Sequence, residues 1–154
     1  MCNDAVKGIS AYHHTALCVS DWARSMDFYQ RLGFNLLIDF LWPEGTSLHK
    51  TILIHEADPT LSVELFEAGD VSYPLPEQHM NTKGAFWHIC FQTHTEEDVD
   101  IAYSYAISIG ATSRMEPTSM RHVLTDGGYL DVRAAFVFGP DGEILEFINQ
   151  KEAE

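Results

Sequence analysis

The sequence predicts an α+β fold built from two tandem βαβββ modules. The main observation is an internal repeat, in which a strand-like segment, a helical stretch ending at a glycine and a later strand carrying a glutamate occur twice in the same order. The first copy begins at His14 and reaches Glu64, and the second begins at His88 and reaches Glu146. Because a repeated unit fixes the architecture of a chain, this order is the primary guide to the fold.

The first module covers about residues 10–68. Alternating side chains predict a strand over 11–19, and Ser20 or Asp21 is placed to cap a helix over 24–32. Gly33 follows the helix, where a glycine commonly ends one. Three further strands are predicted at about 34–42, 47–56 and 60–66, with turns at 43–45 and 57–59 between them.

The second module covers about residues 84–150 and follows the same pattern. A strand is predicted over 86–93, and a helix begins at Thr95 with acidic residues in its first turn and ends before Gly110. Strands at about 112–116, 129–138 and 143–148 complete the module, and 117–128 reads as a long loop. Residues 69–83 lack periodicity and are interpreted as a linker or a lid within a single domain of 154 residues.

Composition excludes several classes of protein. A hydrophobic content of 45% is typical of a folded chain, and a net charge of −14 argues against nucleic-acid binding, which needs clustered cations. Three cysteines, an odd number, favour a reducing compartment over a disulfide framework. Without a signal peptide or a long apolar run, the expectation is a cytoplasmic protein that contacts neither membrane nor nucleic acid.

Alternation along the strands selects four candidate metal ligands. If the faces that carry them line one cavity, His14, Glu64, His88 and Glu146 converge there. Two imidazoles and two carboxylates suit Zn²⁺, Ni²⁺, Co²⁺, Fe²⁺ or Mn²⁺. His13 competes with His14 because a shift of one residue reverses the faces, and the matching position in the repeat favours His14.

The motifs that carry the repeat resemble those of a known family, the vicinal-oxygen-chelate superfamily, which includes glyoxalase I, methylmalonyl-CoA epimerase, extradiol dioxygenases and the fosfomycin and bleomycin resistance proteins. The resemblance spans about residues 10–150. It rests on His14-Thr-Ala-Leu-Cys-Val-Ser-Asp21, Ser25-Met-Asp-Phe-Tyr-Gln-Arg-Leu-Gly-Phe34, Val63-Glu-Leu-Phe66, His88-Ile-Cys-Phe91 and Phe138-Gly-Pro-Asp-Gly-Glu-Ile-Leu-Glu146. It implies curved sheets wrapping a metal, with ligands on the first and last strands of each module.

The four candidate ligands indicate which members of the superfamily the chain resembles most. A His-Glu-His-Glu quartet is similar to that of glyoxalase I, whereas superfamily epimerases often have Gln in place of Glu64. Glutathione-using glyoxalases carry an Arg and an Asn where this chain has Cys18 and Ala68. We therefore expect a glyoxalase-type lyase or isomerase that acts through an enediolate on a small substrate with vicinal oxygens and is not strictly glutathione-dependent.

A divalent metal would polarise the substrate carbonyl, and a glutamate would move the proton. Glu146 is the first candidate for this base and Glu64 the second. The candidates for binding an acidic substrate group are Lys50, Arg121, His122 and Arg133. The candidates for the pocket wall are Cys18, Phe66, Cys90, Gln92, Phe136 and Phe138.

Three alternatives remain open at this point. They are an epimerase of the acyl-CoA type, a ring-cleaving dioxygenase with Fe²⁺ and one glutamate displaced, and a binding protein of the bleomycin-resistance type without catalysis. Members of the superfamily commonly form dimers, so the resemblance also implies a homodimer.

Overall fold

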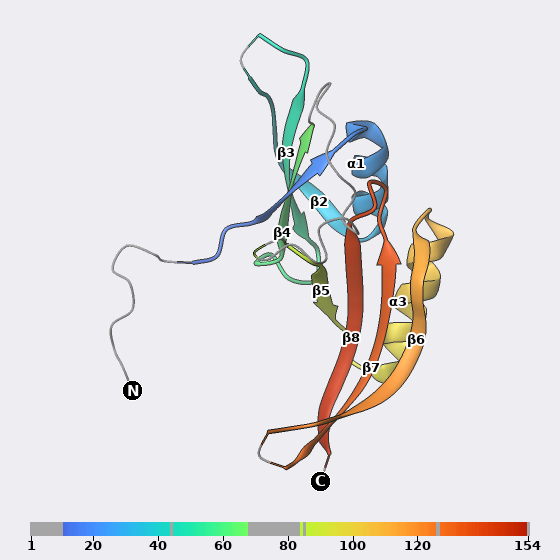
Figure 1. The fold of residues 1–154 in the computed structure, drawn as a ribbon. Coiled ribbons are helices and arrows are strands. Elements are labelled where there is room, and N and C mark those ends of the chain that lie inside the picture. Colours follow the sequence, from blue (N-terminus) through green and yellow to red (C-terminus); the bar gives the residue numbers. More distant parts are fainter. Residues whose placement is uncertain (1–10, 44, 68–83, 85, 126, 154) are drawn as a thin grey trace, which may run out of the picture. The chain divides into compact units, whose positions relative to one another are not determined.

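The computed structural model describes residues 11–43, 45–67, 84, 86–125 and 127–153, which belong to two compact units divided between residues 69 and 70 (Figure 1). The predicted linker, residues 69–83, lies outside the described residues. Each unit has its own four-stranded sheet, as the repeat predicts. The fold is therefore α+β with two similar modules.

The first unit contains β1 (Thr15–Val19), α1 (Trp22–Arg31), β2 (Phe34–Leu41), β3 (His49–His55) and β4 (Ser62–Glu67). Its sheet has the order β1-β4-β3-β2. The first and last strands are neighbours and run parallel, whereas the other two pairings are antiparallel. This order brings the segment after His14 next to the strand that carries Glu64.

Local sequence explains where α1 begins and ends. Asp21 caps the helix, its carboxylate accepting a hydrogen bond of 3.0 Å from the Arg24 backbone N–H. Gly33 has φ of 100°, a left-handed conformation that glycine adopts without steric cost. The core of the unit is formed by side chains with at most 1% exposure, among them Tyr29, Phe34, Leu53 and Leu65.

The second unit contains β5 (Ile89–Gln92), α3 (Glu96–Ser108), β6 (Thr112–Val123), β7 (Tyr129–Phe138) and β8 (Ile144–Ala153). Its sheet has the order β5-β8-β7-β6, again with the first and last strands parallel and adjacent. Thr95 and Asp98 form a capping box that fixes the start of α3. The helix packs on its own sheet through a core that includes Val99, Ala106, Leu145 and Phe147.

The prediction of a loop over 117–128 was wrong for most of that range, because β6 continues to Val123 and pairs with β7. The register of this pairing shifts between Met115 and Thr118, on either side of Pro117. A proline lacks the backbone N–H but is tolerated at an irregularity in an edge strand. The first strands are also shorter than predicted, since β1 begins at Thr15 and β5 at Ile89, so that both candidate histidines precede their strands.

The edge strand β2 exposes an apolar surface. Its large side chains are 40–53% exposed: Leu36, Leu37, Ile38, Phe40 and Leu41. The strand has a register irregularity between Leu36 and Ile38. A long apolar edge strand favours pairing with another chain unless something covers it.

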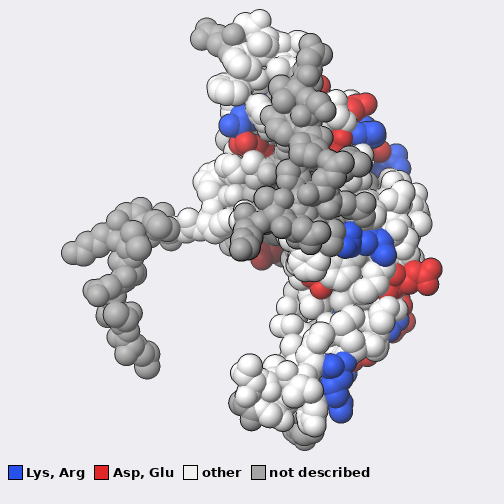
Figure 2. Space-filling view, in the orientation of Figure 1, with Lys and Arg blue, Asp and Glu red and all other residues white. Residues whose placement is uncertain are grey.

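Basic side chains of the described residues are scattered among acidic ones on the face drawn in Figure 2. Several basic side chains of the described residues lie against a carboxylate, in pairs that include Arg31–Asp27, Arg121–Asp131, Arg133–Asp100 and Lys151–Glu96. Neither α1 nor α3 is long and apolar enough to cross a membrane.

Candidate metal centre

The first unit brings His14 and Glu64 together. Ala16 of β1 is the Cα partner of Glu64 on β4, and His14 lies two residues before Ala16. The imidazole Nε2 is 3.6 Å from Oε2 of the glutamate. Glu64 is 6% exposed, so that a strand otherwise filled with core residues holds a carboxylate in a largely buried position.

Two further residues hold this pair in place. The Nδ1 atoms of His13 and His14 are 2.7 Å apart, which makes one imidazole the hydrogen-bond partner of the other. The hydroxyl of Ser62 donates to the His13 carbonyl at 2.6 Å and ties the segment before β1 to β4. His14, and not His13, is therefore the histidine beside Glu64.

Lys50 of β3 lies on the other side of the same carboxylate. Its Nζ is 3.4 Å from Oε1 of Glu64, whereas His14 is near Oε2. The ammonium group also lies 5.5 Å from the ring centroid of Trp42 and 6.0 Å from that of Phe66. A cation at these distances is attracted to the faces of both rings.

The second unit repeats the pairing with His88 and Glu146. The imidazole Nε2 is 2.9 Å from Oε2 of the glutamate, which is 8% exposed. The His88 ring contacts the rings of Trp87 and Phe136. Its Nδ1 is buried and has no hydrogen-bond partner among the described residues. An unsatisfied buried nitrogen costs free energy and calls for an explanation by function or by an unseen partner.

The two pairs occupy the same position in the two sheets. Glu64 faces Ala16 across the parallel pairing of its unit, and Glu146 faces Cys90 across the other. Each histidine lies two residues before that Cα partner. The antiparallel neighbours also correspond, since Ile52 is the partner of Glu64 and Phe136 that of Glu146.

Cys90 adds a sulfur donor to the second pair. One ligand atom each from His88, Cys90 and Glu146 lie within 4.8 Å of one another. Burial raises the pKa of the Cys90 thiol to about 12, and the neighbouring charge of Glu146 and a hydrogen bond to it contribute further. Without a cation the thiol is therefore protonated.

The other predicted pocket residues are divided between the two units. Cys18 is the Cα partner of Phe66, and Gln92 that of Ile148. Phe66 lies beside Trp42 and Lys50, and Phe136 beside Trp87 and His88. Phe138 lies under the guanidinium of Arg114 at 5.4 Å.

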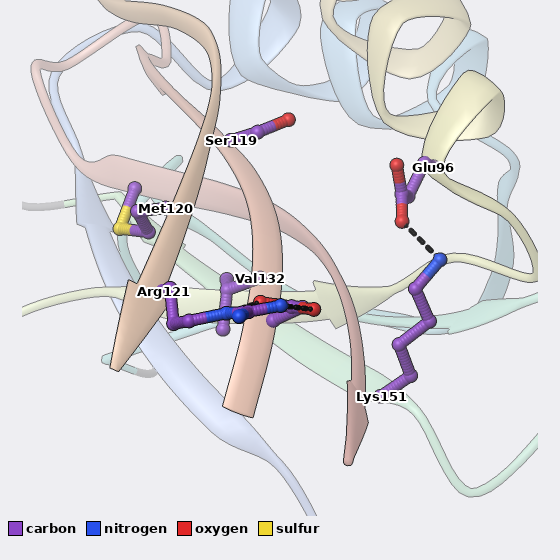
Figure 3. A pocket seen from close by; sticks show the side chains of 7 residues that line it. Glu96, Ser119, Met120, Arg121, Val132 and Lys151 are labelled. Carbon is purple, nitrogen blue, oxygen red and sulfur yellow. Dashed lines mark hydrogen bonds and ion pairs between the residues drawn. The ribbon is translucent and has the colours of Figure 1, made fainter. Parts of the chain in front are cut away.

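The two predicted arginines lie away from the His88–Glu146 pair. Arg133 donates two hydrogen bonds to Asp100 of α3, of which the Nε bond is 2.7 Å, and this places its side chain on the helix-covered face. Because strand faces alternate, Phe136, the neighbour of His88, points to the opposite face. Arg121 is paired with Asp131 at 2.6 Å in a pocket of about 400 Å³ that Lys151 and Glu96 also line (Figure 3). Within the second unit, both arginines are thus separated from His88 and Glu146.

Sequence reasoning missed what Lys50 and His13 contact. The position of Lys50 depends on the pairing of β3 with β4, which no motif specifies. His13 was considered only as a competitor of His14. Cys90 was placed correctly on the face of His88 by alternation, and its direct contact with Glu146 becomes evident only from the pairing of β5 with β8.

Comparison with models of protein families identifies the family of this chain. The model of the Glyoxalase/Bleomycin resistance protein/Dioxygenase superfamily matches residues 11–147. The chain belongs to this superfamily. The resemblance inferred from the motifs is thereby confirmed, and the match includes all four candidate ligands of the superfamily site.

Solved structures share the fold at low sequence identity. A glyoxalase family protein from Enterococcus faecalis is 22% identical with a TM-score of 0.63, covering 90% of this chain and 96% of its own. A mutant of glyoxalase I from Zea mays has the same identity and TM-score and covers 90% of this chain and 44% of its own. A fosfomycin resistance protein from Listeria monocytogenes, complexed with Mn(II) and sulfate, is 16% identical with a TM-score of 0.61, covering 91% and 92%. No curated protein sequence matches the chain.

Proposed function

We propose that the protein is a metal-dependent lyase or isomerase of the glyoxalase type, acting through an enediolate on a small substrate with vicinal oxygens. The observation that carries the proposal is the identical register of the two His–Glu pairs in the two sheets. Core packing alone does not explain a pair that recurs at the same position in both units, since both carboxylates are largely buried. The superfamily to which the chain belongs supports the same conclusion.

The residues present fit a divalent metal. Nitrogen and oxygen ligands lie roughly 2.0–2.2 Å from such an ion. Two ligand atoms on one ion are then about 3.0–3.5 Å apart, close to the 2.9 and 3.6 Å observed within the pairs. We therefore propose His14, Glu64, His88 and Glu146 as ligands of Zn²⁺, Ni²⁺, Co²⁺, Fe²⁺ or Mn²⁺. The bound metal would supply a Lewis acid that polarises the substrate carbonyl.

Glu146 is proposed as the residue that moves the proton. Glu64 is restrained on both carboxylate oxygens, by His14 on one side and Lys50 on the other. Glu146 has His88 and Cys90 as its neighbours, and position 134, which corresponds to Lys50 in the repeat, is a buried alanine. Among the described residues, no lysine or arginine forms an ion pair with Glu146, and a carboxylate without such a pair is better suited to leave its place and return. Glu64 is the second candidate.

Lys50 is proposed to select substrates that carry an acidic group. Its side chain is 29% exposed and lies against the faces of Trp42 and Phe66. An ammonium group that lies against two aromatic rings, next to a proposed metal ligand, can bind a substrate carboxylate. The residues that would bind the glutathione carboxylates in related glyoxalases are replaced by Cys18 and Ala68, so the proposed substrate is not strictly a glutathione adduct.

A homodimer is also proposed. It is supported by the apolar edge strand β2, in which Leu36, Ile38 and Leu41 are about half exposed. A second copy would cover this surface. Sedimentation of the wild type beside an Ile38→Lys variant tests the proposal, because a dimer that uses β2 dissociates in the variant, whereas an unchanged mass in both contradicts it.

Metal removal tests the proposed activity. The purified protein would be screened with α-oxoaldehyde adducts, acyl-CoA epimers and 2-hydroxy ketones, before and after treatment with a chelator. We expect turnover that disappears with the metal and returns when a divalent ion is added back. Turnover that is independent of metal would contradict the proposed mechanism. Oxygen consumption with a catechol would instead indicate the dioxygenase alternative.

A further inference from the structure

Besides Lys50, the two His–Glu pairs differ in the residue that lies opposite the glutamate on the parallel strand. In the first unit the Cα partner of the glutamate is Ala16, which offers no donor. In the second unit the same position holds Cys90, whose thiol hydrogen-bonds to Glu146. The two sites are otherwise built on the same register. The added sulfur is therefore a specific feature of the second unit.

The geometry of Cys90 places its sulfur on the ligand face. His88 directly precedes β5, and Cys90 is the second residue of that strand. Single ligand atoms from His88, Cys90 and Glu146 are all within 4.8 Å of one another. An ion held by the imidazole and the carboxylate is then within reach of the sulfur after a small change of side-chain torsions.

We propose that Cys90 is a further ligand of the metal held by His88 and Glu146, giving the second unit a nitrogen, sulfur and oxygen donor set. The proposal rests on the function proposed above, because it assumes metal binding by that pair. When the metal binds, the S–H bond breaks, the proton passes to solvent and the sulfur lone pair forms the bond to the metal. Metal and sulfur keep their oxidation states.

Such a donor set changes which metals the protein prefers. Thiolate ligands favour Zn²⁺ and other borderline or soft ions, whereas carboxylate and water suit Mn²⁺ and Mg²⁺. His88 and Cys90 would both still hold the metal while Glu146 moves the proton. The inference therefore specifies both the metal class and the residue that remains bound when Glu146 moves the proton.

Cobalt spectroscopy on the full-length chain tests the proposal. Cys2 would be replaced by Ala in every protein, and the metal-free protein would be titrated with Co²⁺. Ligand-field bands in the visible report that Co²⁺ is bound by protein ligands, and a thiolate-to-cobalt charge-transfer band in the near ultraviolet reports a sulfur ligand. We expect both in this background and in Cys18→Ala, the matched thiol control.

Cys90→Ala reproduces the alanine of the first unit and should lose the charge-transfer band but keep the ligand-field bands. The variant should also bind Zn²⁺ more weakly, by at least the roughly 10–100-fold that the loss of an outer-shell partner of a ligand costs. Its affinity for Mn²⁺ should change less. Circular dichroism of the variant verifies that it folds.

A measurement on the unmutated chain avoids any folding defect. Zn²⁺ should slow the alkylation of Cys90 by iodoacetamide and leave the rate at Cys18 nearly unchanged. Peptide mass spectrometry measures both rates.

The cobalt spectra can contradict the proposal in two ways. Ligand-field bands without a charge-transfer band, or a charge-transfer band that persists in Cys90→Ala, would overturn the sulfur ligand and leave the proposed function standing. Absence of Co²⁺ binding would overturn both.

Discussion

Lys50 Nζ lies 3.4 Å from Oε1 of Glu64, on the carboxylate oxygen away from His14. Glu64, which lies on a largely buried strand, thus contacts a cation with one oxygen and an imidazole with the other. The second unit has a buried alanine at the position of Lys50 and a thiol beside its glutamate. The same position in the two sheets therefore holds two carboxylates in different surroundings, and surroundings determine how a carboxylate behaves.

Replacing Lys50 should affect metal and substrate in opposite directions. In Lys50→Met the competing cation is removed from Glu64, so Co²⁺ should bind more tightly at low salt, and the difference should shrink as salt rises. An acidic substrate should bind more weakly, seen as a higher KM. Lys50→Arg is the matched control that keeps the charge. Equal metal affinity in Lys50→Met and Lys50→Arg would contradict the role of the charge.

Replacing each glutamate by glutamine should show which of the two moves the proton. Glu146→Gln should lose about 10²–10⁴-fold in kcat, the range of general acid–base catalysis, because an amide cannot move the proton. Glu64→Gln should lose less in kcat, since its proposed role is to hold the metal. Metal content is measured on the same samples. If both variants keep full turnover with metal bound, neither glutamate moves the proton.

His13 should affect metal binding indirectly. Its Nδ1 is 2.7 Å from Nδ1 of His14 and so helps to orient the ring of that candidate ligand. We expect His13→Ala to weaken metal binding by roughly 10–100-fold, as outer-shell partners of ligands do. His14→Ala should be more severe. An equal loss in both variants, measured by Co²⁺ titration, would show that His13 is itself a ligand.

The ion pair between Arg133 and Asp100 should stabilise the second unit in a pH-dependent way. The Arg133 hydrogen bond lowers the pKa of Asp100 below its ordinary value of 3.8. A carboxyl whose pKa is lowered by folding stabilises the fold above its unfolded pKa, and this contribution disappears as the pH falls through the lowered value. Asp100→Asn should therefore lower Tm slightly at pH 7 and progressively less below about pH 4.

Glu97→Gln, an exposed acid on the same helix, is the control for this comparison. Thermal unfolding of both variants over the acid range measures the difference. A Tm decrease in Asp100→Asn that stays constant down to pH 2 would show that the pair acts through packing and not through charge.

The repeat in the sequence was sufficient to predict the modules and their order. Capping residues such as Asp21 and Thr95 and the glycines at 33 and 110 marked the helix ends because those positions have strict conformational requirements. Residues 117–123 were predicted as a loop because a proline and polar side chains do not show the alternating apolar pattern of a strand. The segment is a strand exposed at a sheet edge. Pairing across the sheet, and not local pattern, determines such a strand.

The two His–Glu pairs were predictable from the sequence, each within its own module. Alternation and the repeat selected His14 and His88, and the structure places each beside its expected glutamate. The surroundings of the pairs were not predictable, because Lys50 reaches Glu64 through the register of β3 and β4. Both arginines were assigned to the pocket by charge alone, whereas Arg133 pairs with Asp100 and Arg121 with Asp131.

The metal content of the purified protein tests the central claim most directly. Elemental analysis of the wild type would be compared with His14→Ala, His88→Ala and Glu146→Ala, and with His94→Ala and Glu97→Ala as exposed controls. We expect a stoichiometric divalent metal in the wild type and controls and a large loss in the three ligand variants. Metal content that is undiminished in the ligand variants, or absent from a folded wild type supplied with metal, would contradict the assignment.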